Sequence, residues 1–290
     1  GRQIIDNMES YMTKTVSEGD MVYLYASVEN GQVIGDFVEY ARVPYIIIFG
    51  ALFGVILIAF SGFKGLRSLV ALLITCAVIF FGFIPLLLEG YNIMLLAVAA
   101  SVIVTIITLI IVCGVDIKAL SAIIGTTLGF LIAGLLAFIM QKLMNMTGLT
   151  DTFANVLYYH NKLDMNGVMF AAIIIGALGA TMDVGVSIAS SLEEIIAHRH
   201  GDITHKEIIK SGMKIGGDIM GTMTNTLILA YVGSSLPIII LIYVNSTQIQ
   251  YTLSWELFSS EFVRAIAGSI GLVCTVPATV IFTVLLHTKR

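Results

Sequence analysis

Apolar stretches of about 20 residues recur along this sequence, and their length limits what the chain can fold into. As a helix, such a stretch crosses the roughly 30 Å hydrocarbon layer of a membrane, because each residue adds about 1.5 Å. Hydrophobic residues fill 58% of the 290 positions and charged residues only 12%, which is about half of the charged share in soluble domains. We therefore expect an all-α polytopic membrane protein.

The apolar stretches predict about seven transmembrane helices, one of them broken. They cover approximately residues 43–60, 67–88, 91–113, 119–141, 167–196, 217–244 and 262–286, with a polar loop, Lys142–Asn166, before the fifth. The sequence Gly233–Pro237 interrupts the sixth stretch, and because proline lacks a backbone donor we expect two half-helices there. The ends of such half-helices expose backbone groups, from which many transporters build ion and substrate sites.

The positions of lysine and arginine predict the orientation, because basic loops tend to stay on the cytoplasmic side. With seven crossings, most basic residues between and after the spans fall on one side, and Lys142 and Lys162 are the main exceptions. The N-terminus is then extracytoplasmic and the C-terminus cytoplasmic.

Residues 1–42 are predicted to form a small extracytoplasmic segment, separate from a transmembrane domain at 43–290. Strand-like alternation in Met21–Val28 and Val33–Tyr40 flanks Asn30-Gly31, which is the strongest short signal for a β-hairpin. A short helix is expected before the hairpin. Because a lone hairpin is barely stable in water, we expect this segment to pack on the membrane surface, on a second copy, or within a larger domain that is truncated here.

Polar residues follow one face of the fifth apolar stretch at helical spacing. This face contains Asp183, Ser187, Ser190, Ser191 and Glu194, and Gly176, Gly179 and Ala180 continue it as a small-residue surface. The sixth stretch repeats the pattern at the same offsets with Asp218, Thr222, Asn225 and Thr226. Small residues let another helix approach closely, so the two polar faces are candidates to meet.

An ionisable residue inside a membrane span is costly and tends to face a partner or water, so a functional role is the default hypothesis. The depth of Asp183 in the membrane can be compared with positions on the sixth stretch. If residues 204–215 form a separate surface helix, Leu229 lies at the depth of Asp183. If one helix runs on from Thr204, Asp218 lies at that depth. Thr222 and Asn225 lie between these limits, and we expect them to share a cavity with Asp183. The predicted ion- or substrate-binding residues are Asp183, Asn225, Thr222, Asp218, Thr181, Ser187 and Thr224.

A purely structural role is the alternative, in which Asp183 only joins helices through hydrogen bonds to Thr181, Thr222 or Asn225. Glu193 and Glu194 are expected at the cytoplasmic boundary, where a solvated carboxylate needs no special role.

Two long strings, GALGATMDVGVSIASSLEEI from Gly176 and SGMKIGGDIMGTMTNTLILAYVGSSLP from Ser211, resemble the YibE/F-like family of bacterial multi-pass membrane proteins, and GLVCTVPAT from Gly271 does so more loosely. The resemblance covers roughly residues 43–286. It implies a bacterial inner-membrane location and that motif positions of the family fall at Asp183, Asp218, Thr222, Thr224 and Asn225. It also implies a β-rich extracytoplasmic segment and often an earlier membrane anchor, from which this chain departs by its short hairpin and the lack of such an anchor.

The leading functional hypothesis is a transporter or permease, coupled to protons or another ion, for a small solute or ion. Asp183 would carry the coupling proton or cation, and hydroxyl, amide and carbonyl oxygens suit a hard cation such as Na⁺. A non-transporting sensor or assembly subunit is a second hypothesis. An intramembrane aspartic protease that uses Asp183 and Asp218 as a dyad is a third, so an enzyme is the less favoured class.

The expected partners are membrane lipids, an unidentified solute or cation, and a second copy of the chain. The net charge of −4 and the absence of a basic cluster of the DNA-reading kind indicate no nucleic-acid partner. No cofactor is expected, and Cys76, Cys113 and Cys274 lie in apolar runs without the spacing of a metal site.

Overall fold

The computed structural model describes residue 17 and residues 19–29, 32–150, 152–198, 204–245 and 253–288. Its chain forms two compact units, Gly1–Leu66 and Arg67–Arg290. The second unit contains every residue of the predicted site.

The first unit contains an antiparallel β-hairpin in which β1 (Val22–Glu29) pairs with β2 (Gln32–Tyr40). The pairing begins with Val22 opposite Tyr40, and a bulge follows between Tyr23 and Leu24. Both predicted strands are confirmed. The predicted turn at Asn30-Gly31 and the short helix before the hairpin lie outside the described residues.

Helix α1 (Val43–Ala77) follows the hairpin and is broken at Gly62. Gly62 has φ 56° and ψ −133°, a conformation that glycine adopts easily because it has no Cβ. The break lies close to residue 60, where the sequence predicts the first span to end. A π-helix, η1 (Val78–Phe83), and a short helix, α2 (Ile84–Leu88), continue the chain.

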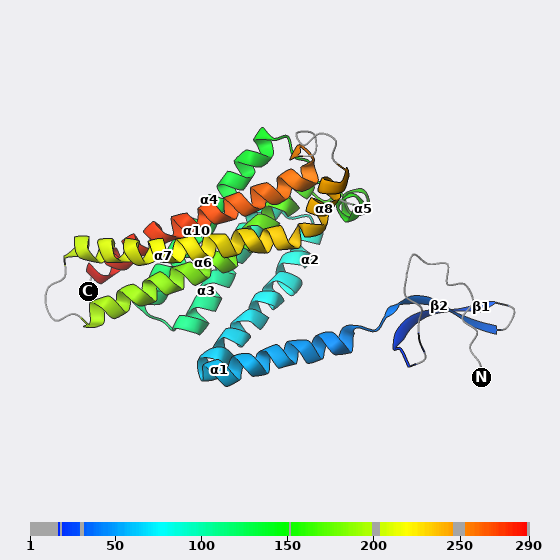
Figure 1. The fold of residues 1–290 in the computed structure, drawn as a ribbon, viewed down its shortest axis with the longest axis horizontal. Helices are drawn as coiled ribbons and strands as arrows, with labels where there is room; N and C mark the ends of the chain where they lie inside the picture. Colours follow the sequence, from blue (N-terminus) through cyan, green and yellow to red (C-terminus); the bar gives the residue numbers. More distant parts are fainter. Residues whose placement is uncertain are drawn as a thin grey trace. The chain divides into compact units, whose positions relative to one another are not determined.

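The second unit is a helical bundle whose long helices lie side by side (Figure 1). Its long helices are α3 (Ile93–Cys113), α4 (Ile117–Leu143), α6 (Met165–His198), α7 (His205–Ser234) and α10 (Glu256–Thr288). Helix α10 contacts α4, α6 and α7, and α6 also contacts α3 and α4. Aliphatic residues of α6 and α10, such as Ile188, Leu192, Leu272 and Val276, are fully buried between these helices. Helices α6 and α10 therefore form the centre of the bundle.

Glycines let the backbones of α4 and α10 touch. A Cβ atom added to Gly129 would lie 2.8 Å from the carbonyl oxygen of Gly271, and one added to Gly271 would lie 2.6 Å from the carbonyl oxygen of Gly129. Close contact between small residues is the usual means by which membrane helices associate, because lipid supplies little hydrophobic driving force.

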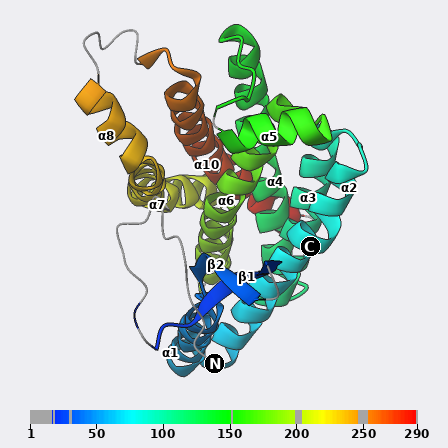
Figure 2. The same cartoon turned by 90° about the vertical axis from the view of Figure 1, so that its right-hand side faces the viewer.

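Helix α7 runs without interruption from His205 to Ser234, so residues 204–215 do not form a separate surface helix. Ser235 forms a turn, and α8 (Leu236–Asn245) begins after it. Pro237 has no N–H to continue the hydrogen-bond ladder of α7. Figure 2 views α7 end-on and shows α8 leaving its axis. The predicted break in the sixth apolar stretch is confirmed.

Five of the described helical segments are long and apolar enough to cross a membrane, so the predicted number of about seven is not confirmed. Val43–Leu88 is a single candidate of 46 residues where the sequence predicts two spans, and α7 is not among the five. The predicted loop Lys142–Asn166 contains a helix, α5 (Thr152–Asn161), and α10 begins at Glu256, earlier than the predicted residue 262.

Candidate functional site

Asp183 lies near the middle of α6, on the face turned away from the core of the second unit. Its side chain is exposed and makes no hydrogen bond or ion pair with the part of the chain that the structure describes. Its neighbours Val184 and Gly185 are buried. The exposed positions of α6 also include Gly176, Gly179, Ser187 and Glu194, whereas Ala180, Ser190 and Ser191 of the predicted polar face are half-buried. The predicted face is therefore exposed only in part.

Thr181 belongs to the opposite side of α6. Its side chain is fully buried, and its Oγ1 donates hydrogen bonds to the carbonyl oxygens of Ala177 and Leu178, both at 3.0 Å. Its own carbonyl oxygen accepts a hydrogen bond of 3.3 Å from Oγ1 of Thr126 in α4. Thr181 therefore joins α6 to α4 and does not neighbour the carboxylate of Asp183.

The polar face of α7 is also exposed, but it points away from the bundle. Gly216 is buried and Leu227 packs on the core between α6 and α10. Asp218 and Asn225 are exposed, and at about 3.6 residues per turn they lie on the side opposite to Gly216 and Leu227. Neither side chain makes a hydrogen bond or ion pair with the described residues.

The two threonines of this part of α7 differ in environment. Thr222 is exposed, and its Oγ1 donates to the carbonyl oxygen of Ile219 at 3.1 Å. Thr224 is half-buried, and its Oγ1 is enclosed without a hydrogen-bond partner in the described part of the chain. Hydroxyl groups that bond back to their own helix are available to a ligand only as acceptors, so Thr222 offers a lone pair rather than a proton.

The depths of Asp183 and Thr222 agree. A Cβ added to Gly216 would lie 3.5 Å from Cδ1 of Ile188, which fixes the level at which the antiparallel helices α7 and α6 meet. Asp183 precedes Ile188 by five residues, so in the antiparallel α7 it is level with the fifth residue after Gly216, in the turn that contains Thr222. For one continuous helix the residue expected at this level is Asp218, so the observed match lies about one turn further along α7. Asn225 does not face Asp183, because it lies on the far side of α7.

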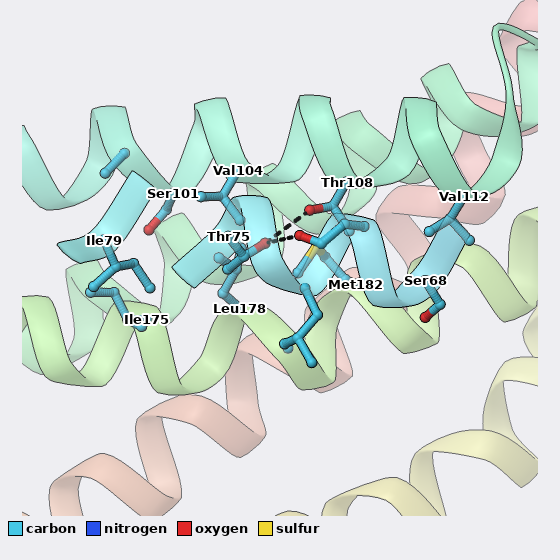
Figure 3. A pocket seen from close by; sticks show the side chains of 14 residues that line it. Ser68, Thr75, Ile79, Ser101, Val104, Thr108, Val112, Ile175, Leu178 and Met182 are labelled. Carbon is cyan, nitrogen blue, oxygen red and sulfur yellow. Dashed lines mark hydrogen bonds between the residues drawn. The ribbon is translucent and has the colours of Figure 1, made fainter. Parts of the chain in front are cut away.

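A groove of about 290 Å³ borders the polar face of α6 (Figure 3). Its walls come from α1 after Arg67, η1, α3 and α6, and Gly179 belongs both to the groove and to the exposed face that carries Asp183. The lining is mainly apolar, with Thr75 and Thr108 joined through their hydroxyl oxygens at 3.2 Å. The Oγ of Ser101 is buried and has no hydrogen-bond partner among the residues that the structure describes. The groove thus brings a few hydroxyl groups, but no charge, next to the exposed face.

The sequence profile of YibE/F-like proteins matches residues 49–289. The chain belongs to the YibE/F-like family. This confirms the resemblance seen in the two long strings. No curated protein and no solved structure matches the chain. The matched range includes both polar faces, the groove and the break between α7 and α8.

The YibE/F-like chain also contains an ion pair within α10 that the sequence did not lead us to predict. Nη1 of Arg264 lies 2.9 Å from Oε1 of Glu261, and the Oγ of Ser235 donates to Oε2 of Glu261 at 3.2 Å. Ser235 directly follows the last residue of α7. Arg264 falls inside the predicted seventh span, and an arginine inside a membrane span was the signal that could have identified this pair from the sequence.

Proposed function

We propose that this YibE/F-like chain is a membrane transporter or permease, coupled to protons or another cation, for a small solute or ion. The observation that carries the proposal is Asp183, a carboxylate midway along α6 without a partner in the described chain. A charged residue at the centre of a membrane helix costs about 2.5–3.5 kcal/mol. A bound proton or cation would remove that cost, which is the requirement for a coupling site.

The exposed face of α6 offers a hydroxyl oxygen beside the carboxylate, because Ser187 follows Asp183 by one turn and is also exposed. Thr222 is at a similar depth, but it belongs to the exposed polar side of α7. Carboxylate and hydroxyl oxygens are ligands that hard cations prefer. Asn225 and Asp218 lie on the outer side of α7, so their participation requires either a rotation of α7 or a second copy of the chain. We therefore include a homo-oligomer in the proposal.

The proposed arrangement in the membrane has seven crossings, and one of them is a broken helix. The break at Gly62 divides Val43–Leu88 into two crossings, and α7 with α8 forms a discontinuous sixth. We propose that the protein lies in the bacterial inner membrane with an extracytoplasmic N-terminus and a cytoplasmic C-terminus, as the distribution of lysine and arginine favours.

Flux through proteoliposomes tests the coupling role of Asp183. Vesicles loaded with a pH-sensitive or a sodium-sensitive dye are exposed to an outward proton or sodium gradient, and the rate of dye response is compared with that of empty vesicles. We expect Asp183→Asn to insert normally but to lose most of the protein-dependent cation flux, because an amide cannot carry the charge. The matched control is Glu194→Gln, which also removes one carboxylate from α6 but near the end of the helix, and its flux should equal that of the original protein. Equal flux in the Asp183→Asn variant and the original protein would remove the proposal.

One observation favours the second hypothesis, a sensor or assembly subunit. The polar side of α7, with Asp218 and Asn225, faces outward and is suited to contact another protein. Cation flux by the purified protein in vesicles that contain no other protein would argue for the transporter. Nothing in the geometry favours the protease hypothesis, because Asp218 lies on the side of α7 turned away from α6.

A further inference from the structure

The end of α7 meets a charged pair inside the bundle. Both oxygens of the Glu261 carboxylate are occupied, one by Arg264 at 2.9 Å and one by the hydroxyl of Ser235 at 3.2 Å. The side chains of Arg264 and Glu261 are only 26% and 20% exposed, respectively. The same spacing of charges occurs in the hairpin unit at Glu39 and Arg42, but that pair is 44% and 60% exposed.

The guanidinium of Arg264 has more hydrogen-bond donors than the described residues around it satisfy. A guanidinium group carries five N–H donors, and the ion pair with Glu261 is the hydrogen-bonding contact that Arg264 makes with the described residues. Its Nε is enclosed without a hydrogen-bond partner among those residues. Buried polar groups nearly always have partners. The missing group is therefore an acceptor, and its best complement to a guanidinium is an anion.

A cavity of about 220 Å³ opens beside Arg264 and Glu261. Gly148 and Thr150 from the connection between α4 and α5 and Ser260 of α10 also line it, and residues of α5 and α6 supply its apolar part. The amide of Gly148 already donates to the carboxylate of Glu256, and the hydroxyl of Ser260 to the carbonyl oxygen of Leu257. Its volume is below the roughly 300–1,000 Å³ of drug-sized ligand sites. The cavity is therefore suited to a compact group.

We propose that this cavity binds a compact oxyanion, a carboxylate or phosphate group, through the guanidinium of Arg264. Arginine matches such groups because its planar N–H donors form two parallel hydrogen bonds to two oxygens. The group is either a free anion or the headgroup of an anionic lipid. The bound anion competes with Glu261 for Arg264, and Glu261 is hydrogen-bonded to Ser235, so occupancy is linked to the break between α7 and α8. This site is separate from Asp183 and does not depend on the coupling role proposed for it.

Thermal unfolding of the full chain in a neutral detergent tests the site with inorganic phosphate and acetate as probes. Each anion is titrated against chloride at constant ionic strength. We expect saturable stabilisation of the original protein and a loss of about tenfold or more in affinity for Arg264→Gln, which removes charge-assisted hydrogen bonds. Glu261→Gln removes the competing carboxylate, and it should bind the anion at least as tightly as the original protein.

Matched variants separate binding from folding. Arg264→Gln leaves Glu261 unpaired, so the double variant Glu261→Gln/Arg264→Gln, which removes both charges, is included and should not respond to the anions. Arg42→Gln, in the exposed pair of equal spacing, should respond as the original protein does. Nanodiscs of phosphatidylcholine with and without phosphatidylglycerol distinguish the sources, because a headgroup ligand stabilises only in the anionic discs and only when Arg264 is present. Stabilisation that is equal in the double variant, or absent in both detergent and anionic nanodiscs, would overturn the proposal.

Discussion

Gly129→Ala is expected to destabilise the bundle by about 2 kcal/mol. The new Cβ would lie 2.8 Å from the carbonyl oxygen of Gly271 and would collide with Oγ1 of Thr275, which itself donates to that carbonyl oxygen at 2.9 Å. The carbonyl oxygen of Gly271 belongs to the backbone and cannot rotate away as a side chain can, so α4 and α10 must move apart. Overpacking typically costs about 1–3 kcal/mol, and we expect the upper end here. Alanine is more favourable than glycine inside a helix by up to about 1 kcal/mol. Subtracting this gain from the overpacking cost leaves a net destabilisation of about 2 kcal/mol.

The measurement is unfolding of the purified protein in mixed micelles, followed by circular dichroism as the fraction of denaturing detergent rises. Gly221→Ala is the matched control, because Gly221 lies inside α7 and nothing would lie within 4 Å of its new Cβ. This control should be as stable as the original protein or more stable by up to about 1 kcal/mol. If both variants unfold at the same denaturant fraction, the reasoning from backbone contact between α4 and α10 is wrong.

Two further substitutions test other contacts. Glu256→Gln should lower the free energy of unfolding by about 1–2 kcal/mol in the same assay. The reason is that the Glu256 carboxylate accepts hydrogen bonds from the backbone N–H of Thr147 at 2.6 Å and from its hydroxyl at 2.8 Å. Unchanged stability would show that these bonds do not stabilise the position of α10. Asn225→Leu should lower the mass of the complex measured by light scattering if the outer side of α7 joins two copies, whereas Ile103→Leu, at an exposed position of α3, should not. An unchanged mass for the Asn225 variant would argue against a second copy at this face.

Features with strong local signals were predictable from the sequence. The hairpin depends on alternation around a turn pair, and the break in the sixth stretch depends on Pro237, which cannot donate a backbone hydrogen bond wherever the helix packs. The shared exposed face of Asp183 and Ser187 follows from the helical period alone. These features need no knowledge of neighbouring helices.

The features that the sequence analysis missed depend on how helices are rotated against each other. Periodicity shows that Asp218, Thr222 and Asn225 share a side of α7, but it does not show which side meets α6. In the structure the small residues Gly212 and Gly216 pack inward. This rotation of α7 about its axis places Asn225 on the outer side. The pairing of Glu261 with Ser235 joins two helices distant in sequence, so it also required the tertiary structure.

The exposed polar faces limit what can cover them in a membrane. Asp183 needs a proton, a cation or a hydrogen-bond donor, because an uncompensated charge there costs about 2.5–3.5 kcal/mol. Residues 43–61, the apolar part of α1 before its break, offer only Tyr45 and Ser61 as side-chain donors, close to the two ends of that segment. The middle of that segment therefore contains no side chain that could donate a hydrogen bond to a carboxylate. A proton, a bound cation, water or a second polar helix is therefore needed at the exposed face of α6, and the first two of these are the species that the proposed coupling role of Asp183 requires.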